Sequence, residues 1–331
     1  MDLILPTPPD PAKEARSKAE VLDTLSPLVE GMMEEHLAKR RLWMPSEFLP
    51  ADEQMSDDED ARRLALRERA RGVDDACRVS LVVGLLTEEG LPHFHRLIAT
   101  NLGEDHVWWR WNVLWTAEED RHGGVLRDYV RDARLFSFRH VEMMQYAYQE
   151  AGFRPQWDRD PYKVFVYTSL QERATQAAHA NTGKRADAHE PTLAGILASI
   201  AADEARHFSF YRRVFKAILE VDVNRALESA LAIIPALEMP GSSMPHFREM
   251  ADVIRRVGIY GPWEYRKIVD EAIDFWQIGV LTGLNEAGRR AQEKLMTVSD
   301  RLKRTAEILE QRTTQKSFSF EFLYNRILAL Q

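Results

Sequence analysis

The sequence predicts an all-α protein, and two observations carry this prediction. Long stretches, of which residues 63–100 are an example, are rich in Leu, Ala, Arg and Glu, residues that favour helix. Apolar residues in these stretches recur every three or four positions, which is the period of a helix face. No alternating strand pattern with hairpin turns persists along the chain, so we expect no β-sheet.

Helix boundaries are marked by proline and by polar segments. Ser26-Pro27, Asp160-Pro161 and Glu190-Pro191 each place Pro where a first helical residue would lie, because that position needs no N–H donor. The segments expected to break the helices are an acidic loop at 50–58, a polar turn at 181–190, a connection at 238–246 and a looser tail from 311–317. None is long enough for a domain linker, so we expect a disordered N-terminus over 1–10 and a single domain over 11–331.

Composition and charge exclude several classes of protein. The chain is 45% hydrophobic and 29% charged, which is typical of a globular protein and not of a disordered one. Its longest apolar run, at 79–86, is far shorter than the roughly 20 residues that span a bilayer. A net charge of -8 argues against broad nucleic-acid binding. A single cysteine, Cys77, and a start without a secretory signal favour a soluble, cytoplasmic protein, with Cys77 as a small buried residue.

One hexapeptide pattern occurs twice. Of the ten histidines, only His122 and His207 have Glu three residues upstream, at Glu119 and Glu204. The surrounding residues, AEEDRH at 117–122 and ADEARH at 202–207, both fit A-[DE]-E-x-R-H. Two chance copies of such a hexapeptide are improbable, so the repeat indicates a shared function.

Each hexapeptide is preceded by another Glu at a similar distance. Glu88 lies 31 residues before Glu119, and Glu172 lies 32 residues before Glu204. Glu and His at i and i+3 share one helix face, and separations near thirty suit an antiparallel helix pair joined by a loop. One Glu from each of two helices and Glu-x-x-His from two others is the ligand pattern of ferritin-like di-iron bundles.

We therefore expect a ferritin-like di-iron four-helix bundle core with additional helices. The predicted ligands of two Fe ions are Glu88, Glu119, His122, Glu172, Glu204 and His207. The alternatives are a solvated helix face, or a bundle that holds zinc or no metal. Because metal-bound His usually donates its other N–H to a carboxylate, we predict that Asp203 holds His122 and Glu118 holds His207.

Several longer stretches carry a family resemblance and occur in the family's order. They are RLWMPSEFLP (41–50), LTEEGLP (86–92), WTAEEDRHG (115–123), DPYKVFVYTSLQERAT (160–175), HANTG (179–183), IAADEARH (200–207) and LTGLNEAGRRAQ (281–292). From about residue 20 onward the chain resembles the soluble acyl-[acyl-carrier-protein] desaturases. The resemblance implies O2-dependent insertion of a cis double bond into a fatty acyl chain on acyl carrier protein.

The resemblance also implies roles for single residues and for partners. The six predicted ligands match the family's iron ligands, and Thr175 matches the threonine near the O2 site. Trp43 matches a tryptophan on the proposed electron path through Asp203 and His122, although a core or surface anchor is an alternative for this residue. The implied partners are acyl carrier protein, a ferredoxin-type electron donor and a second copy of the chain in a homodimer.

The sequence departs from the plant members of the family in two places. The connection between Glu88 and Glu119 is shorter and contains four tryptophans, Trp108, Trp109, Trp111 and Trp115. Val164 stands where plant relatives commonly have Gly in the region of the acyl cavity, and its side chain could shorten or bend that cavity. These differences bear on acyl length and double-bond position, not on the ligands.

The sequence offers several candidate docking surfaces and is compatible with two other functions. Acidic partners need basic patches, and the candidates are Arg62/Arg63/Arg67/Arg69, Arg212/Arg213/Lys216 and Arg255/Arg256. One rival function is another di-iron oxygenase, a hydroxylase or an arylamine N-oxygenase. The other is a non-enzymatic iron-binding bundle.

Overall fold

The computed structural model describes residues 17–49, 57–103, 106–155, 157–311 and 314–331. The helices of the first half are α1 (Lys18–Lys39), α2 (Asp57–Ala70), α3 (Asp75–Glu88), α4 (Leu91–Leu102), α5 (His106–Ala133) and α6 (Phe138–Ala151). Those of the second half are α7 (Pro161–Ala186), α8 (Pro191–Val221), α9 (Val223–Ile233), α10 (Phe247–Arg256), α11 (Pro262–Phe275), α12 (Glu286–Met296) and α13 (Val298–Gln311). Short 3-10 helices η1 (Pro45–Glu47), η2 (Ile234–Ala236), η3 (Pro240–Ser243), η4 (Ile278–Val280) and η5 (Glu321–Leu323) lie between them. The all-α prediction is confirmed.

Four helices, α3, α5, α7 and α8, form the central bundle. Two of the predicted starts are correct: α7 begins at Pro161, where the Asp160 carboxylate accepts from two first-turn N–H groups, and α8 begins at Pro191. Glu190 caps α8 from a fully buried position, where Arg69 pairs with its carboxylate at 3.1 Å. A tight turn therefore sets α7 and α8 side by side along most of their length.

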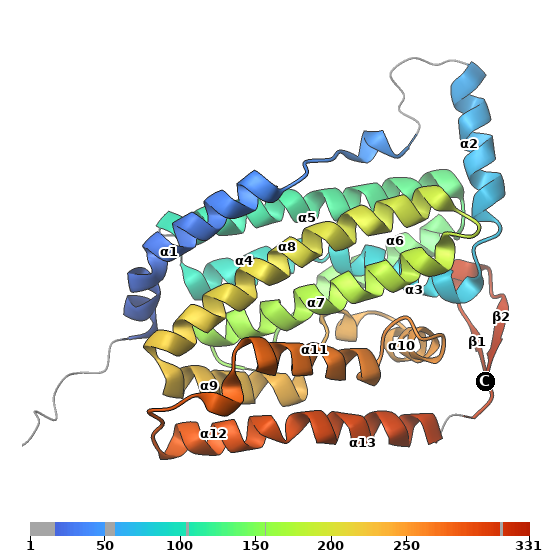
Figure 1. Ribbon diagram of the computed structural model, residues 1–331. Coiled ribbons are helices and arrows are strands. Elements are labelled where there is room, and N and C mark those ends of the chain that lie inside the picture. Colours follow the sequence, from blue (N-terminus) through green and yellow to red (C-terminus); the bar gives the residue numbers. More distant parts are fainter. Residues whose placement is uncertain (1–16, 50–56, 104–105, 156, 312–313) are drawn as a thin grey trace, which may run out of the picture.

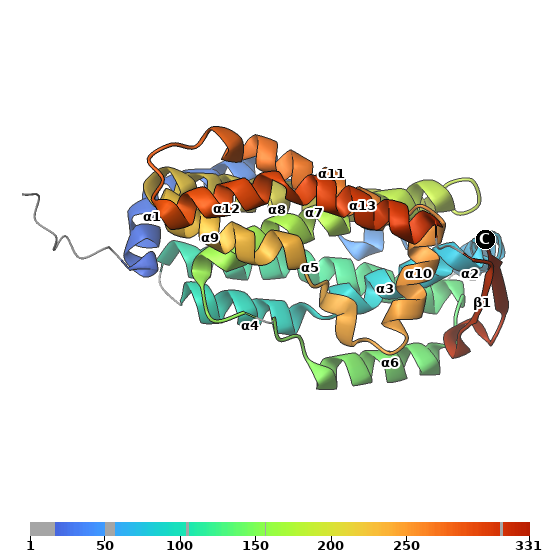
Figure 2. The ribbon, with the colours of Figure 1, turned by 90° about the horizontal axis from the view of Figure 1, so that it is seen from below.

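The remaining helices cover this bundle in layers. Figure 1 shows α9 and α11 beneath α7, and α12 and α13 running end to end below them. Figure 2, viewed from below, shows α4 and α6 along another side. Helix α1 lies on the outside of α5 and α8. Of the helices that the structure describes, none combines the length and the apolar character that crossing a membrane requires.

Two apolar clusters lie at opposite ends of the bundle, and a polar layer separates them. On α5, residues 107–115 belong to one cluster and residues 125–133 to the other. On α8, residues 193–200 and 210–219 divide in the same way. Between these stretches lie the buried side chains of Glu119, His122, Glu204 and His207. Burying carboxylates in such a layer is costly unless they are paired or bound to a metal.

Three predicted boundaries are wrong. Pro27 does not start a helix but lies inside α1, which begins at Lys18 with a capping box formed by Ser17 and Glu20. The polar turn predicted at 181–190 shrinks to four residues, because α7 continues through Ala186. The connection between Glu88 and Glu119 is not a loop but contains the helix α4. The break at 238–246 is confirmed.

The expectation of no β-sheet is also wrong. Strands β1 (Lys316–Ser319) and β2 (Ile327–Leu330) form an antiparallel hairpin in which Phe318 lies opposite Leu328. Both side chains are buried in the second apolar cluster with Phe320 and Phe322. The alternating phenylalanines of KSFSFEF are the strand signal that was missed. Most of the loop predicted at 50–58 and the N-terminus at 1–10 lie outside the described residues, and α2 begins at Asp57.

Candidate metal centre

The six predicted ligands come from the four central helices and converge in the polar layer. Glu88 is the last residue of α3, and Glu172 lies near the middle of α7. The two Glu-x-x-His pairs lie on the facing surfaces of α5 and α8. All six side chains are buried, and both histidines are wholly inaccessible to solvent.

The ligand atoms form two overlapping groups. Glu88, Glu119, His122 and Glu204 make one, and Glu172 and His207 join the same Glu119 and Glu204 in the other. Glu119 directs Oε2 toward Nδ1 of His122 at 3.3 Å and Oε1 toward Nδ1 of His207 at 2.8 Å. Glu204 likewise directs one oxygen at each histidine, at 3.6 and 3.7 Å. These two carboxylates, which belong to both groups, are therefore the ones that would contribute an oxygen to each of two metal ions.

Unpartnered atoms show that the residues fit a metal pair. Within the part of the chain that the structure describes, five buried ligand atoms have no partner with hydrogen-bond geometry. They are Oε1 of Glu119, Nδ1 of His122, Oε2 of Glu172, Oε2 of Glu204 and Nδ1 of His207. An orphaned buried acceptor costs about 1–3 kcal/mol, and a cation would remove that cost. Four carboxylates also balance the charge of two divalent ions.

Proton affinities in the cluster reflect crowding of negative charge. Burial raises the pKa of Glu172 well above its usual range, and the Glu204 carboxylate raises it further. Burial and the Glu119 carboxylate act in the same direction on Glu204, but the nearby Glu172 carboxyl and the two imidazoles hold its pKa at about 2. Burial works against a charged imidazole, yet the facing carboxylates raise the pKa of His122 and His207 well above the ordinary value. Protons on Glu172, His122 and His207 thus offset the negative charge of the carboxylates, which metal cations could offset instead.

The contact predicted between Asp203 and His122 is present. Asp203 Oδ2 lies 3.2 Å from Nε2 of His122 and accepts from the Trp43 indole at 3.0 Å. The Trp43 ring stacks parallel to the His122 ring, with centroids 6.0 Å apart. Arg121 donates to both Asp203 and the Trp43 carbonyl, and its guanidinium lies over the indole. Trp43 is therefore a buried member of this network.

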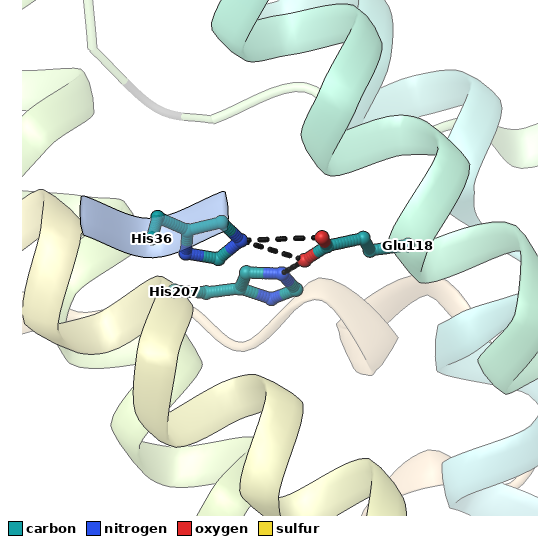
Figure 3. A group of neighbouring side chains, drawn as sticks. All are labelled: His36, Glu118 and His207. Atoms are coloured by element: carbon teal, nitrogen blue, oxygen red, sulfur yellow. Dashed lines mark hydrogen bonds and ion pairs between the residues drawn. The ribbon is translucent and has the colours of Figure 1, made fainter. Parts of the chain in front are cut away.

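The contact predicted between Glu118 and His207 is also present, and a residue that sequence reasoning missed completes it. Nε2 of His207 lies 2.9 Å from Glu118 Oε2. His36 of α1 contacts the same carboxylate from beside His207, as Figure 3 shows. Burial alone would raise the pKa of Glu118, but the hydrogen bonds from His207 and His36 hold it below its usual range. A lone His in the last turn of a helix offers no local sequence signal.

Two more ligand partners were missed. His179 Nε2 lies 2.8 Å from Oε1 of Glu88, and the Trp115 indole donates to Oε1 of Glu172 at 3.1 Å. His179 belongs to HANTG and Trp115 to WTAEEDRHG, so both stand in stretches that carry the resemblance. Thr175, by contrast, donates to the carbonyls of Gln171 and Glu172 in its own helix.

A largely apolar cavity of about 590 Å³ adjoins the cluster. Glu88, Thr175 and His179 form the polar part of its wall nearest the ligands. Apolar side chains of α3, α7, α10, α13 and the segment 235–239 supply most of the rest. Arg248 and Thr305 also line it and are exposed, so the cavity reaches the surface there. Its volume falls in the range of small-molecule sites, about 300–1,000 Å³.

The family profile described as fatty acid desaturase matches residues 17–324, nearly the whole chain. The chain belongs to this fatty acid desaturase family. It is 34% identical over 308 residues to stearoyl-[acyl-carrier-protein] 9-desaturase 3 of Arabidopsis thaliana, covering 87% of this chain and 76% of the relative. It is 30% identical over 301 residues to palmitoyl-[acyl-carrier-protein] 4-desaturase of Coriandrum sativum, covering 86% and 78%.

A solved structure agrees with the fold of the desaturase family. An X-ray structure from Mycobacterium tuberculosis H37Rv, assigned as the acyl-ACP desaturase DesA2, superimposes with a TM-score of 0.56 at 23% identity. The match covers 82% of this chain and 99% of that one. The family resemblance and the ferritin-like helical fold inferred from sequence are confirmed.

The two sequence departures from plant desaturases have structural outcomes. Val164 lies in the apolar core and is not among the described residues that line the cavity, so a shortened or bent cavity at this position stays a prediction. Of the four tryptophans, Trp108, Trp111 and Trp115 are buried beside the ligand layer, and Trp109 is half exposed. The aromatic run therefore packs the bundle around the centre.

Proposed function

We propose that this desaturase-family protein inserts a cis double bond into a fatty acyl chain carried on acyl carrier protein. The observation that carries the proposal is the cavity, whose largely apolar wall includes Glu88, one of the six residues that we propose hold two metal ions. Family membership and the acyl-[acyl-carrier-protein] desaturases among the relatives support the substrate class.

The proposed cofactor is a pair of iron ions. Glu88 and His122 would hold one ion, Glu172 and His207 the other, and Glu119 and Glu204 both. Such a centre supplies O2-dependent oxidation strong enough to break an unactivated C–H bond, which side-chain acid–base chemistry does not achieve. The net reaction converts –CH2–CH2–, O2, two electrons and two protons into –CH=CH– and two water molecules.

The protein's own contribution is positioning. Apolar walls exclude water and hold the acyl chain extended, so that only the methylenes near Glu88 and Thr175 meet the oxidant. The buried Thr175 hydroxyl donates to the Glu172 carbonyl at 3.0 Å, and Thr175 lines the same cavity as Glu88. His179 contacts Glu88, and Trp115 donates to Glu172. Glu88 and Glu172 are the two carboxylates that belong to only one ligand group each.

Electrons must come from outside, and we propose that they enter through Trp43. Its indole and the His122 imidazole bond to the same oxygen of Asp203, which links the side of the bundle near η1 to the metal layer. A ferredoxin-type donor, a homodimer and a cytoplasmic location stay predictions. So do the docking patches, in which Arg212 pairs with Glu271, Arg213 with Glu35 and Arg255 with Asp252.

The test is a single turnover of the iron-loaded protein. The apoprotein is loaded with Fe2+ without oxygen, reduced, mixed with a panel of acyl carriers of different length and exposed to O2. Mass spectrometry of the acyl group should show loss of two hydrogens on one or more members. A gain of one oxygen atom would favour a hydroxylase instead, and turnover of a small aromatic amine would favour an N-oxygenase. Iron uptake with no oxidation of any substrate would favour an iron-binding bundle.

A further inference from the structure

His36 reaches the metal layer from outside the four-helix bundle. It lies in the last turn of α1, with a side chain only 4% exposed. Its Nε2 lies 3.2 and 3.0 Å from the two oxygens of Glu118, the carboxylate that also contacts Nε2 of His207 at 2.9 Å. Figure 3 shows the two imidazoles stacked on one side of Glu118, with both directed at its carboxylate.

The shared carboxylate determines the tautomers. An ionised carboxylate only accepts hydrogen bonds, so both imidazoles must present Nε2–H to it. For His207 this leaves Nδ1, the atom that faces Glu119, Glu172 and Glu204, as the one available to bind a metal. Anything that fixes Glu118 therefore fixes the ligand form and the ring orientation of His207.

The two histidine ligands are supported differently. On the His122 side, Asp203 is held by Trp43, Arg121 and Arg206, and two of these donors come from α5 and α8 themselves. On the His207 side, Glu118 receives hydrogen bonds from His36 and from Arg40 at 3.3 Å, both of which are contributed by α1 and its C-cap. The support of His207 thus depends on an accessory helix.

Packing gives His36 one orientation. Its ring stacks on the His207 ring, with centroids 5.9 Å apart and an interplanar angle of 16°. The Trp111 ring lies nearly perpendicular to it, with centroids 5.2 Å apart. Because His207 and Trp111 pack against the ring and Nε2 contacts Glu118, the side chain has little freedom to turn away.

We propose that His36 is a positioning residue for the metal ligand His207, acting through Glu118, so that seating of α1 completes one half of the metal site. The inference rests on the proposed two-metal centre. It concerns only the half of the centre formed by Glu172 and His207, and it leaves the His122 half unchanged.

The test compares His36→Leu with His36→Gln. Leu fills a similar volume without a donor, whereas the Gln amide can still donate to Glu118. The full-length apoprotein is titrated with Co2+, whose visible absorption reports ligand geometry at each ion. We expect His36→Leu to weaken binding of one of two ions by about 10- to 100-fold and to change its spectrum. His36→Gln should keep both ions within about threefold of wild type.

Controls separate this idea from a packing effect and from the proposed function. Met33→Leu, a buried change one turn earlier in α1, should leave both ions and their spectra unaltered. If His36→Leu fails to fold, His36→Asn takes its place, because its shorter amide does not reach Glu118. The role of His36 is overturned if wild type and His36→Leu bind two ions with the same affinity. It is also overturned if His36→Leu and His36→Gln lose metal affinity equally. Failure of the wild-type protein to bind two ions overturns the metal centre itself.

Discussion

At the scale of single residues, the carboxylates shared by both ligand groups decide whether two ions can be held together. Glu119 and Glu204 each point one oxygen at each histidine, so neither has a substitute in the cluster. Glu88 and Glu172 contact one group each. Loss of a shared carboxylate should therefore weaken both ion sites, whereas loss of a carboxylate outside the groups should weaken neither.

Glu204→Gln should abolish binding of two ions, because an amide removes the negative charge and supplies only one acceptor oxygen. Metal analysis of the loaded protein should fall from two ions per chain toward one or none, with affinity reduced more than about tenfold. Glu89→Gln is the matched control, since Glu89 adjoins Glu88 but pairs with Arg127 and belongs to neither group. Two tightly bound ions in Glu204→Gln would contradict the bridging role.

Cys77 shows what burial does to a nucleophile. Its side chain is fully buried on α3, and burial, reinforced by the Asp74 carboxylate, raises the pKa of the thiol to about 12. The thiol should therefore stay neutral and unreactive toward an alkylating reagent at pH 8, where an ordinary cysteine is partly ionised. Mass spectrometry should find no adduct on the native protein and one adduct after unfolding in denaturant. Rapid labelling of the native protein would show that Cys77 is accessible.

At the scale of elements, α1 begins where its cap is and not where its proline is. The capping box of Ser17 and Glu20 satisfies first-turn N–H groups, and the buried stripe that includes Leu22, Val29 and Met33 holds the helix on the bundle. Pro27 is tolerated on the exposed side although it removes one backbone hydrogen bond. Tertiary packing thus outweighs the local preference.

Pro27→Ala should consequently stabilise the protein. Alanine restores the hydrogen bond and relieves the clash with the preceding turn, a gain of up to about 3 kcal/mol. Greater freedom of the unfolded chain offsets about 0.4–1 kcal/mol of this gain. Thermal or denaturant unfolding should therefore show a net increase of up to about 2 kcal/mol in the free energy of unfolding. A lower stability of Pro27→Ala would mean that the proline is favourable in its native place.

At the scale of the whole molecule, the polar layer between two apolar clusters links metal binding to stability. Without cations, buried carboxylates face one another and the orphaned atoms remain unpaired. A metal that binds this folded arrangement and not the unfolded chain would shift the folding equilibrium toward the folded state.

Metal loading should raise the melting temperature. At a free ion concentration about 100 times Kd, each site adds about 2.7 kcal/mol, which corresponds to a rise of several degrees. Adding a chelator to Co2+-loaded protein should reverse the rise when followed by circular dichroism. Glu204→Gln should show a smaller rise or none. The same melting temperature with and without metal would argue against a site in the core.

Local chemistry in the sequence determined the helical class, the starts at Pro161 and Pro191 and the choice of the six predicted ligands, because caps and i, i+3 spacing act within one helix. The pairing of Asp203 with His122 and of Glu118 with His207 followed from the repeat. Only the tertiary structure decided the roles of His36, His179 and Trp115, the cavity and the position of Val164. These features bring together helices that are distant in sequence. Their contacts depend on how whole helix faces pack, which a local sequence pattern does not predict.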